Sequence, residues 1–169
     1  AARGRVADAL LQDLLREPYL YQPPPKTTGR ELFGAQFGAR VWEQGMTRGL
    51  RPADIVATLT AFTVQAVART LRAFVFPSTA IQEVVVMGGG AENAALMRGL
   101  AEALPECAVV PADSLGVPGR AVEAMAFAAL AFLTATGQPG NLPRVTGARD
   151  FRVLGCIVPG KNYRGLRHD

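Results

Sequence analysis

The stretch VVVMGGGAEN, residues 84–93, constrains the fold more than any other part of the sequence. Its consecutive valines are typical of a strand that is buried on both faces. Glycine loses more conformational freedom on folding than any other residue, so a run of three, Gly88, Gly89 and Gly90, needs a structural or functional reason. A strand that ends in glycines and enters a helix is a recurrent anion-binding geometry, because backbone N–H groups at a helix start favour negative charge. A purely structural turn is the alternative.

Two common glycine-rich motifs do not account for this stretch. The phosphate loop GxxxxGK[ST] is absent from the sequence. The dinucleotide fingerprint GxGxxG fails because Asn93 stands where its third glycine should be. That motif also needs an acidic residue at the end of the next strand, whereas here Pro111 is followed by Ala112 and only then by Asp113. The glycines therefore belong to a different kind of site or turn.

The spacing of apolar residues predicts a helical first half and an α/β second half. Helices are expected over residues 5–16, 31–46, 52–75, 92–103 and 120–136, and strands over 84–86, 107–111 and 151–158. The second half has the order strand, glycine stretch, helix, strand, helix, strand, which predicts an α/β fold with at least two crossover connections. Trp42 and the phenylalanines are expected in the core.

Composition excludes several classes of function. The 169 residues are 49% hydrophobic and 19% charged, which suits a packed globular protein. The net charge is only +4 and no run of five Lys or Arg occurs, so no nucleic-acid partner is expected. The longest apolar run, 124–135, is too short to cross a bilayer, so no membrane partner is expected. Cys107 and Cys156 lie far apart and the single histidine is His168, which predicts free buried thiols and no metal site.

Several ordered motifs together resemble one family. The segment VVMGGGAENAAL resembles the adenosine-contacting loop of the acetate/sugar kinase, heat-shock ATPase and actin superfamily. The whole set resembles the C-terminal half of anhydro-N-acetylmuramic acid kinases, and it covers residues 6–159. Its other members are PPKTTGRELF (24–33), DIVATLTAFT (54–63), VEAMAFAALA (122–131), GNLPRVTGA (140–148) and RVLGCIVPG (152–160).

This resemblance implies an α/β fold class: one lobe of the actin-like sugar-kinase ATPase fold, with a mixed sheet, flanking helices and a helical N-terminal part. Residues 1–169 would form a C-terminal nucleotide-binding lobe, helical over 1–76, α/β over 77–160 and a tail over 161–169. The implied reaction uses ATP with Mg²⁺ to phosphorylate 1,6-anhydro-N-acetylmuramic acid while water opens the anhydro bridge. The products are N-acetylmuramic acid 6-phosphate and ADP, in cytoplasmic recycling of peptidoglycan.

The resemblance also suggests roles for individual residues. Gly88, Gly89 and Gly90 match the nucleotide loop. Asn93 either caps the following helix or hydrogen-bonds the nucleotide. Glu123 is the only charge on its apolar helix. It is either a first-turn acid favoured by the helix dipole or, as in the family, a side chain that binds sugar hydroxyls and helps orient the attacking water.

The family's N-terminal lobe, with its phosphate loop and catalytic aspartate, has no counterpart in this sequence. The base is therefore expected upstream of Ala1, and Asp8 and Asp13 are interpreted as surface charges on an ordinary helix. The fragment alone is expected to lack turnover, because phosphoryl transfer needs a positioned nucleophile and a Mg²⁺-bound phosphate clamp. The alternatives are a non-catalytic nucleotide-binding or assembly module and another sugar kinase of the superfamily. The long apolar helices are compatible with a homodimer.

The threonines allow a functional and a structural interpretation. In PPPKTTGRE, Thr28 and Glu31 have the spacing of a capping box, which favours a rigid turn over a wall of the nucleotide cleft. Thr58 and Thr60 are expected on a buried helix, with hydroxyls bonded to the preceding turn. In the functional interpretation of this segment, the side chains that contact the nucleotide are Lys26, Thr27, Thr28 and Arg30.

Overall fold

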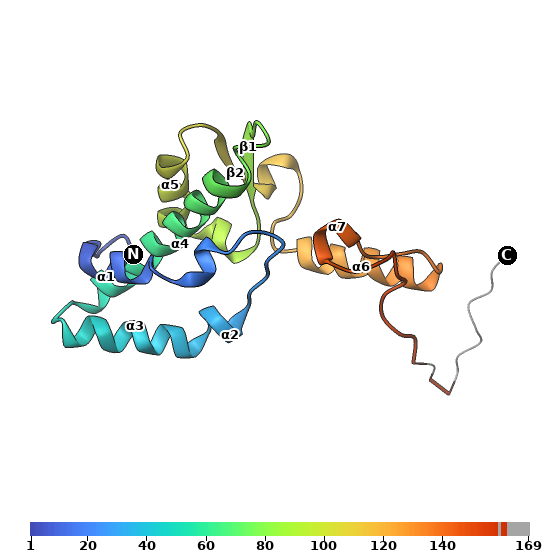
Figure 1. Cartoon of the computed structure of the whole chain (residues 1–169), viewed down its shortest axis with the longest axis horizontal. Coiled ribbons are helices and arrows are strands. Elements are labelled where there is room, and N and C mark those ends of the chain that lie inside the picture. Colours follow the sequence, from blue (N-terminus) through green and yellow to red (C-terminus); the bar gives the residue numbers. More distant parts are fainter. Residues whose placement is uncertain (159, 162–169) are drawn as a thin grey trace. The chain divides into compact units, whose positions relative to one another are not determined.

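The computed structural model describes residues 1–158, 160 and 161, in two compact units that divide between Gly119 and Arg120 (Figure 1). Unit 1 contains α1 (Asp8–Leu14), a 3₁₀ turn (Pro18–Tyr21), α2 (Arg30–Phe33), α3 (Ala35–Thr47), α4 (Pro52–Phe74), β1 (Glu83–Val86), a 3₁₀ turn (Gly88–Glu92), α5 (Ala94–Ala103), β2 (Ala108–Pro111) and a 3₁₀ turn (Ala112–Leu115). Unit 2 contains α6 (Val122–Ala135) and α7 (Pro143–Thr146). Four of the five predicted helices are present with ends that differ by a few residues, and two helices stand in place of the fifth.

Helix α4 is the central element of unit 1. Pro52 stands at its first turn, where a missing N–H costs nothing, and the apolar stripe behind it continues for 23 residues. One face of α4 packs against α1 and α3, and the opposite face packs against α5 and the sheet. The first core contains Leu10, Leu11, Leu14, Leu15, Leu20, Phe37, Val41, Ile55 and Phe62, and the second contains Val64, Ala68, Leu100 and Leu104.

The predicted helix over 31–46 is divided in two. Gly34 separates α2 from α3 with an extended backbone (ψ −153°). The chain bends so tightly there that a side chain on Gly34 would meet the Arg30 carbonyl. Farther along α3, Gly45 faces Ile55 of α4, and a Cβ on Gly45 would lie 2.5 Å from the Ile55 Cδ1 atom. Trp42, which was expected in the core, is 45% exposed because it lies beside the buried stripe of α3, about 100° around the helix from Val41.

Helix α4 also fixes the N-terminal segment. The Thr58 hydroxyl donates to the Asp54 carbonyl at 2.7 Å and accepts from the Ala7 N–H at 2.9 Å, and the side chain is fully buried. The Thr60 hydroxyl donates to the Val56 carbonyl at 3.0 Å. The prediction that both hydroxyls bond to the preceding turn is confirmed, and Thr58 in addition satisfies a backbone donor from outside the helix.

Two carboxylates of this helical half are held by arginines. Arg51 lowers the pKa of Asp54 from 3.8 to about 2, and the Arg5 N–H also contributes through a 2.8 Å hydrogen bond. Arg48 lowers the pKa of Asp13 through a 2.6 Å contact. Asp13 and the exposed Asp8 lie at the surface of α1, as predicted.

The sheet contains two parallel strands within the described residues, with the register Glu83↔Ala108 to Val86↔Pro111. Helix α5 makes the connection between them, so the strands over 84–86 and 107–111 and one crossover are confirmed. The expected mixed sheet is not found in this part of the chain. Burial is partial along both strands, so the expectation of strands buried on both faces is only partly met.

The predicted strand over 151–158 is wrong. Its backbone groups pair with α6 and a loop instead of with a neighbouring strand. Gly140 donates to the Arg152 carbonyl at 3.0 Å, and the Asn141 amide donates to the Asp150 carbonyl at 3.0 Å. The Thr134 hydroxyl donates to the Leu154 carbonyl. The residues of this segment favour a strand, but no neighbouring strand among the described residues pairs with them. The segment is therefore irregular and contacts α6.

Every side chain of α6 is at least partly exposed in unit 2, although the helix is largely apolar. Phe127 and Phe132 are 65% and 63% exposed, so these aromatic rings are not in a core. Cys156 is exposed and Cys107 is half-buried, which corrects the expectation of two buried thiols. His168 lies outside the described residues. Among the helices that the structure describes, none is both long and apolar enough to cross a membrane.

Candidate functional site

The glycine loop, defined as Gly88, Gly89 and Gly90, follows β1 directly. Met87 continues the extended backbone of the strand, and at Gly88 the chain turns with a φ of +73°. The loop then forms a 3₁₀ turn that leads to Asn93 and α5. The Gly88 N–H donates to the Gly119 carbonyl at 3.1 Å. This hydrogen bond joins the first residue of the glycine loop to the last residue of unit 1.

The three glycines are needed for different reasons. Gly88 has the left-handed conformation that disfavours any residue with a Cβ atom. Gly90 packs against α5, where a Cβ would lie 3.4 Å from the Leu96 Cδ2 atom. Gly89 has a negative φ, and among the described residues no atom beyond its own two chain neighbours lies within 4 Å of the point where its Cβ would be. The fold itself thus does not require glycine at position 89, and close approach of a ligand would explain it.

Asn93 is the N-cap of α5. Its Oδ1 atom accepts hydrogen bonds from the N–H groups of Ala95 at 3.1 Å and Leu96 at 3.2 Å. These groups lie at the helix start and have no acceptor within the helix. The capping alternative is therefore confirmed for the side-chain oxygen, and the helix N-terminus is already occupied by an uncharged acceptor.

Asp113 lies beside the glycine loop, and the sequence motifs did not identify it. Val86 and Pro111 are register partners, so the chain segments that follow β1 and β2 leave the sheet at the same edge. The Asp113 Oδ1 atom accepts a hydrogen bond from the Gly119 N–H at 3.4 Å. The available signal was its position two residues after a parallel strand, at the edge where α/β proteins bind ligands.

Glu123 lies in the first turn of α6 and is exposed. It is the only ionisable residue of that helix, which agrees with both of the interpretations given above. It belongs to unit 2, whereas the glycine loop and Asn93 belong to unit 1. The structure therefore brings the loop and Asn93 together and gives no distance from them to Glu123.

The PPPKTTGRE segment has mainly structural contacts. Lys26 donates to the carbonyls of Tyr19 at 3.1 Å and Leu20 at 3.2 Å, and its ammonium lies 4.9 Å from the centre of the Tyr19 ring. The predicted Thr28–Glu31 capping box is wrong, because α2 begins one residue later and Gly29 is its N-cap. The Glu31 carboxylate accepts from the Gly29 N–H at 2.5 Å. The remaining polar side chains, those of Thr27, Thr28 and Arg30, are exposed.

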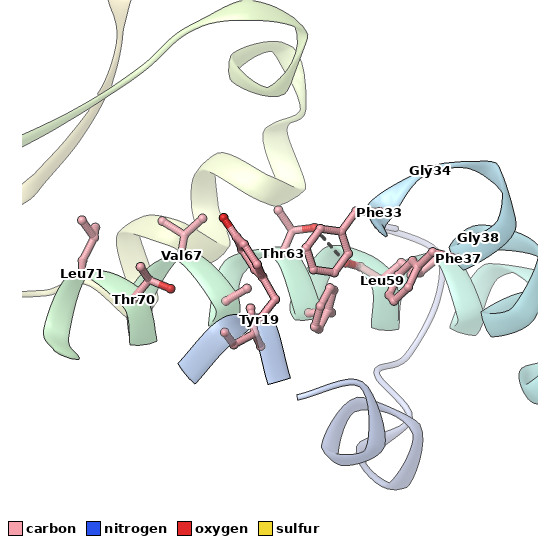
Figure 2. A pocket seen from close by; sticks show the side chains of 13 residues that line it. Tyr19, Phe33, Gly34, Phe37, Gly38, Leu59, Thr63, Val67, Thr70 and Leu71 are labelled. Carbon is pink, nitrogen blue, oxygen red and sulfur yellow. Dashed lines mark hydrogen bonds between the residues drawn. The ribbon is translucent and has the colours of Figure 1, made fainter. Parts of the chain in front are cut away.

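An apolar groove of about 590 Å³ lies away from the glycine loop, along α4 (Figure 2). It is lined by aromatic and aliphatic side chains, among them Tyr19, Phe33, Phe37 and Val67. The hydroxyl of Thr63 on its wall donates to the Leu59 carbonyl at 3.1 Å. Ligand sites combine apolar walls with a few convergent polar groups. The groove offers few polar groups and does not suit a nucleotide.

The described residues contain no cluster of three His, Cys, Asp or Glu side chains that would hold a metal ion by itself. A Mg²⁺ ion that arrives with a nucleotide is coordinated largely by phosphate oxygens and water, with one or two carboxylates from the protein. The described residues thus form no protein cage for a metal ion.

Comparison with known proteins gives a consistent result. A family model for anhydro-N-acetylmuramic acid kinase matches residues 1–160. A curated protein of that name from Bordetella avium is 49% identical over 160 residues, which is 94% of this chain and 41% of the relative. Relatives of the same name from Cupriavidus pinatubonensis and Rhodococcus erythropolis are each 48% identical, over 94% and 93% of this chain. The chain spans 42% and 37% of those two relatives.

Proposed function

The chain belongs to the anhydro-N-acetylmuramic acid kinase family, and we propose that it is the nucleotide-binding lobe of an ATP-dependent kinase. That kinase opens and phosphorylates 1,6-anhydro-N-acetylmuramic acid and releases N-acetylmuramic acid 6-phosphate and ADP. Recycling of peptidoglycan in the cytoplasm is part of the same proposal, as is the pairing of two copies of the chain. The observation that carries the proposal is the open, side-chain-free backbone at Gly89.

The glycine loop suits the adenosine end of ATP better than its phosphates. Oδ1 of Asn93 already accepts from the first N–H groups of α5, so a phosphate at that helix start would compete with the cap. The Asp113 carboxylate near the loop also disfavours a second negative charge. A flat aromatic base or a ribose can lie on a backbone that carries no side chain. The loop therefore supports contact with an adenosine.

The proposed kinase divides its chemistry between this chain and the rest of the protein. Phosphoryl transfer needs in-line geometry, a base and a Mg²⁺-bound phosphate clamp. We place the nucleotide loop in this chain, with Glu123 on the sugar side, and assign the catalytic aspartate and the phosphate-binding loop to residues outside this sequence. The chain on its own then binds ATP and does not turn it over.

Calorimetry on the 169-residue chain tests this proposal. Titration with ATP and Mg²⁺ should give saturable binding with one site per chain. Adenosine should compete with ATP, whereas inorganic pyrophosphate should not, because the loop contacts the adenosine. A chain with a folded circular dichroism spectrum and no heat of binding from ATP contradicts the proposal, and so does competition by pyrophosphate alone.

Substitution of Glu123 with glutamine tests the sugar side in the longer kinase. Loss of the charge should raise the KM for the anhydro-sugar about tenfold, the effect of one hydrogen bond to a charged group. The KM for ATP should stay the same, because the glycine loop is unchanged. Glu43→Gln, an exposed carboxylate on α3, is the control and should alter neither value. A Glu123→Gln enzyme with an unchanged KM for the sugar leaves Glu123 as a first-turn acid only.

A further inference from the structure

Two loops meet at the edge of the sheet that carries the glycine loop. The first leaves β1 at Met87, and the second leaves β2 and forms the 3₁₀ turn Ala112–Leu115 before it reaches Gly119. Gly119 is buried between them. Its carbonyl accepts from the Gly88 N–H at 3.1 Å, and its own N–H donates to the Asp113 Oδ1 atom at 3.4 Å. Asp113 is thus linked to Gly88 through one residue.

Gly119 leaves no space between these groups. A Cβ on Gly119 would lie 2.8 Å from the Asp113 Oδ2 atom and 3.7 Å from the Gly88 nitrogen. The carboxylate and the Gly88 backbone therefore approach the same side of Gly119. A side chain on Gly119 would therefore push the exposed Asp113 carboxylate away from its present position.

The 3₁₀ turn itself does not need the Asp113 carboxylate. The turn is closed by backbone hydrogen bonds, from the Gly116 N–H to the Asp113 carbonyl at 3.1 Å and from the Val117 N–H to the Ala112 carbonyl at 3.2 Å. The Ser114 hydroxyl adds a bond to the Pro111 carbonyl at 2.7 Å. The side chain of Asp113 instead reaches Gly119, which is outside the turn.

We propose that Asp113 is a positioning residue for the nucleotide: through Gly119 it holds Gly88 in its left-handed conformation and so keeps the glycine loop in its open 3₁₀ turn. The part of this inference that concerns ATP rests on the proposed function. The part that concerns the loop does not, because the hydrogen bonds link residues of the chain itself. Asp113 acts through Gly119 and is not assigned a direct contact with the ligand.

Amide hydrogen exchange followed by NMR tests the link in the nucleotide-free chain. In Asp113→Ala, the Gly88 amide should exchange about fivefold faster, the effect of weakening one hydrogen bond. Amides of α1 and α3 should keep their rates, which a general loss of stability would not allow. Asp113→Asn retains an oxygen acceptor at Oδ1 and should restore slow exchange. Ser114→Ala removes a bond within the same turn and should leave Gly88 unchanged.

The same variants are then titrated with ATP and Mg²⁺. Asp113→Ala should bind ATP about fivefold more weakly than the parent chain, whereas Asp113→Asn and Ser114→Ala should bind it equally well. Unchanged Gly88 exchange in Asp113→Ala overturns the proposal, and so does faster exchange without weaker ATP binding.

Two further results are informative. If the parent chain does not bind ATP, the proposed function fails while the exchange rates still decide whether Asp113 holds the loop. If Asp113→Ala does not fold, Gly119→Ala replaces it. Its Cβ would displace the Oδ2 atom of Asp113, and it should accelerate Gly88 exchange in the same way. Slow Gly88 exchange in a folded Gly119→Ala chain overturns the proposal.

Discussion

Replacement of Gly89 with valine is expected to weaken ATP binding by a factor of about 10 to 100 while the chain remains folded. The region around Gly89 is open within the described residues, and its φ is negative, so the fold accepts a side chain there. A bound adenosine would occupy that open space. Forcing extra carbon atoms into a packed contact costs about 1–3 kcal/mol, and 1.4 kcal/mol is a factor of about ten in affinity.

Gly38→Val is the matched control for this experiment. Apart from its chain neighbours and the backbone of its own helix, no described atom lies within 4 Å of the Cβ position at Gly38, so the same substitution is sterically tolerated on α3, away from the glycine loop. Calorimetry should give the parent affinity for Gly38→Val and a weakened one for Gly89→Val, and thermal unfolding should show that both chains are folded. Equal ATP affinities in the two variants would contradict the proposal that a bound ligand occupies the space next to Gly89.

The largest loss of stability is expected for Gly45→Val. Gly45 lies where α3 crosses α4, and its Cβ would be 2.5 Å from the Cδ1 and Cγ1 atoms of Ile55. Ile55 is fully buried and cannot turn away. The new side chain must therefore separate the two helices, and overpacking of this kind lowers the free energy of unfolding by about 1–3 kcal/mol.

Gly38→Val again supplies the comparison, because it is the same substitution on the same helix. Valine has a higher helix propensity than glycine, so Gly38→Val should unfold at the parent denaturant concentration or slightly above it. Urea unfolding of the two variants separates steric overlap from helix propensity. If Gly45→Val is as stable as Gly38→Val, then α3 and α4 are not in close contact at Gly45.

The elements that the sequence predicted well have strong local signals. Helix α4 begins at Pro52, and its apolar stripe ends within a residue of the predicted end. Strands β1 and β2 were predicted from their valine-rich sequences, and both form because they pair with each other in parallel. The capping role of Asn93 was one of two stated alternatives and follows from its place before the first turn of α5.

The predictions that were wrong depend on contacts that are distant in the sequence. Residues 151–158 have the composition of a strand, and only their pairing with Gly140, Asn141 and Thr134 decides against it. The exception is the bend at Gly34, which is local, because the chain turns there against the Arg30 carbonyl and apolar spacing does not show it.

The candidate site was predicted in part. The glycine loop stands out in the sequence because three glycines follow a strand, although the sequence alone does not distinguish the separate reasons for Gly88, Gly89 and Gly90. Asp113 comes close to the loop only because β1 and β2 are neighbours in register. The role of Glu123 stays a prediction, since it belongs to the second unit.

Helix α4 contributes side chains to both cores of unit 1. The stability of the helical half and the stability of the sheet therefore both depend on this one helix. Partial melting of α1 or α3 exposes one face of α4 and weakens the surface against which the sheet packs. The folding of unit 1 is therefore expected to be cooperative, with a single transition in place of stepwise loss of its two halves. The glycine loop, at the edge of the two strands that the structure describes, is therefore expected to lose its conformation when the leucine core between α1 and α4 is disrupted.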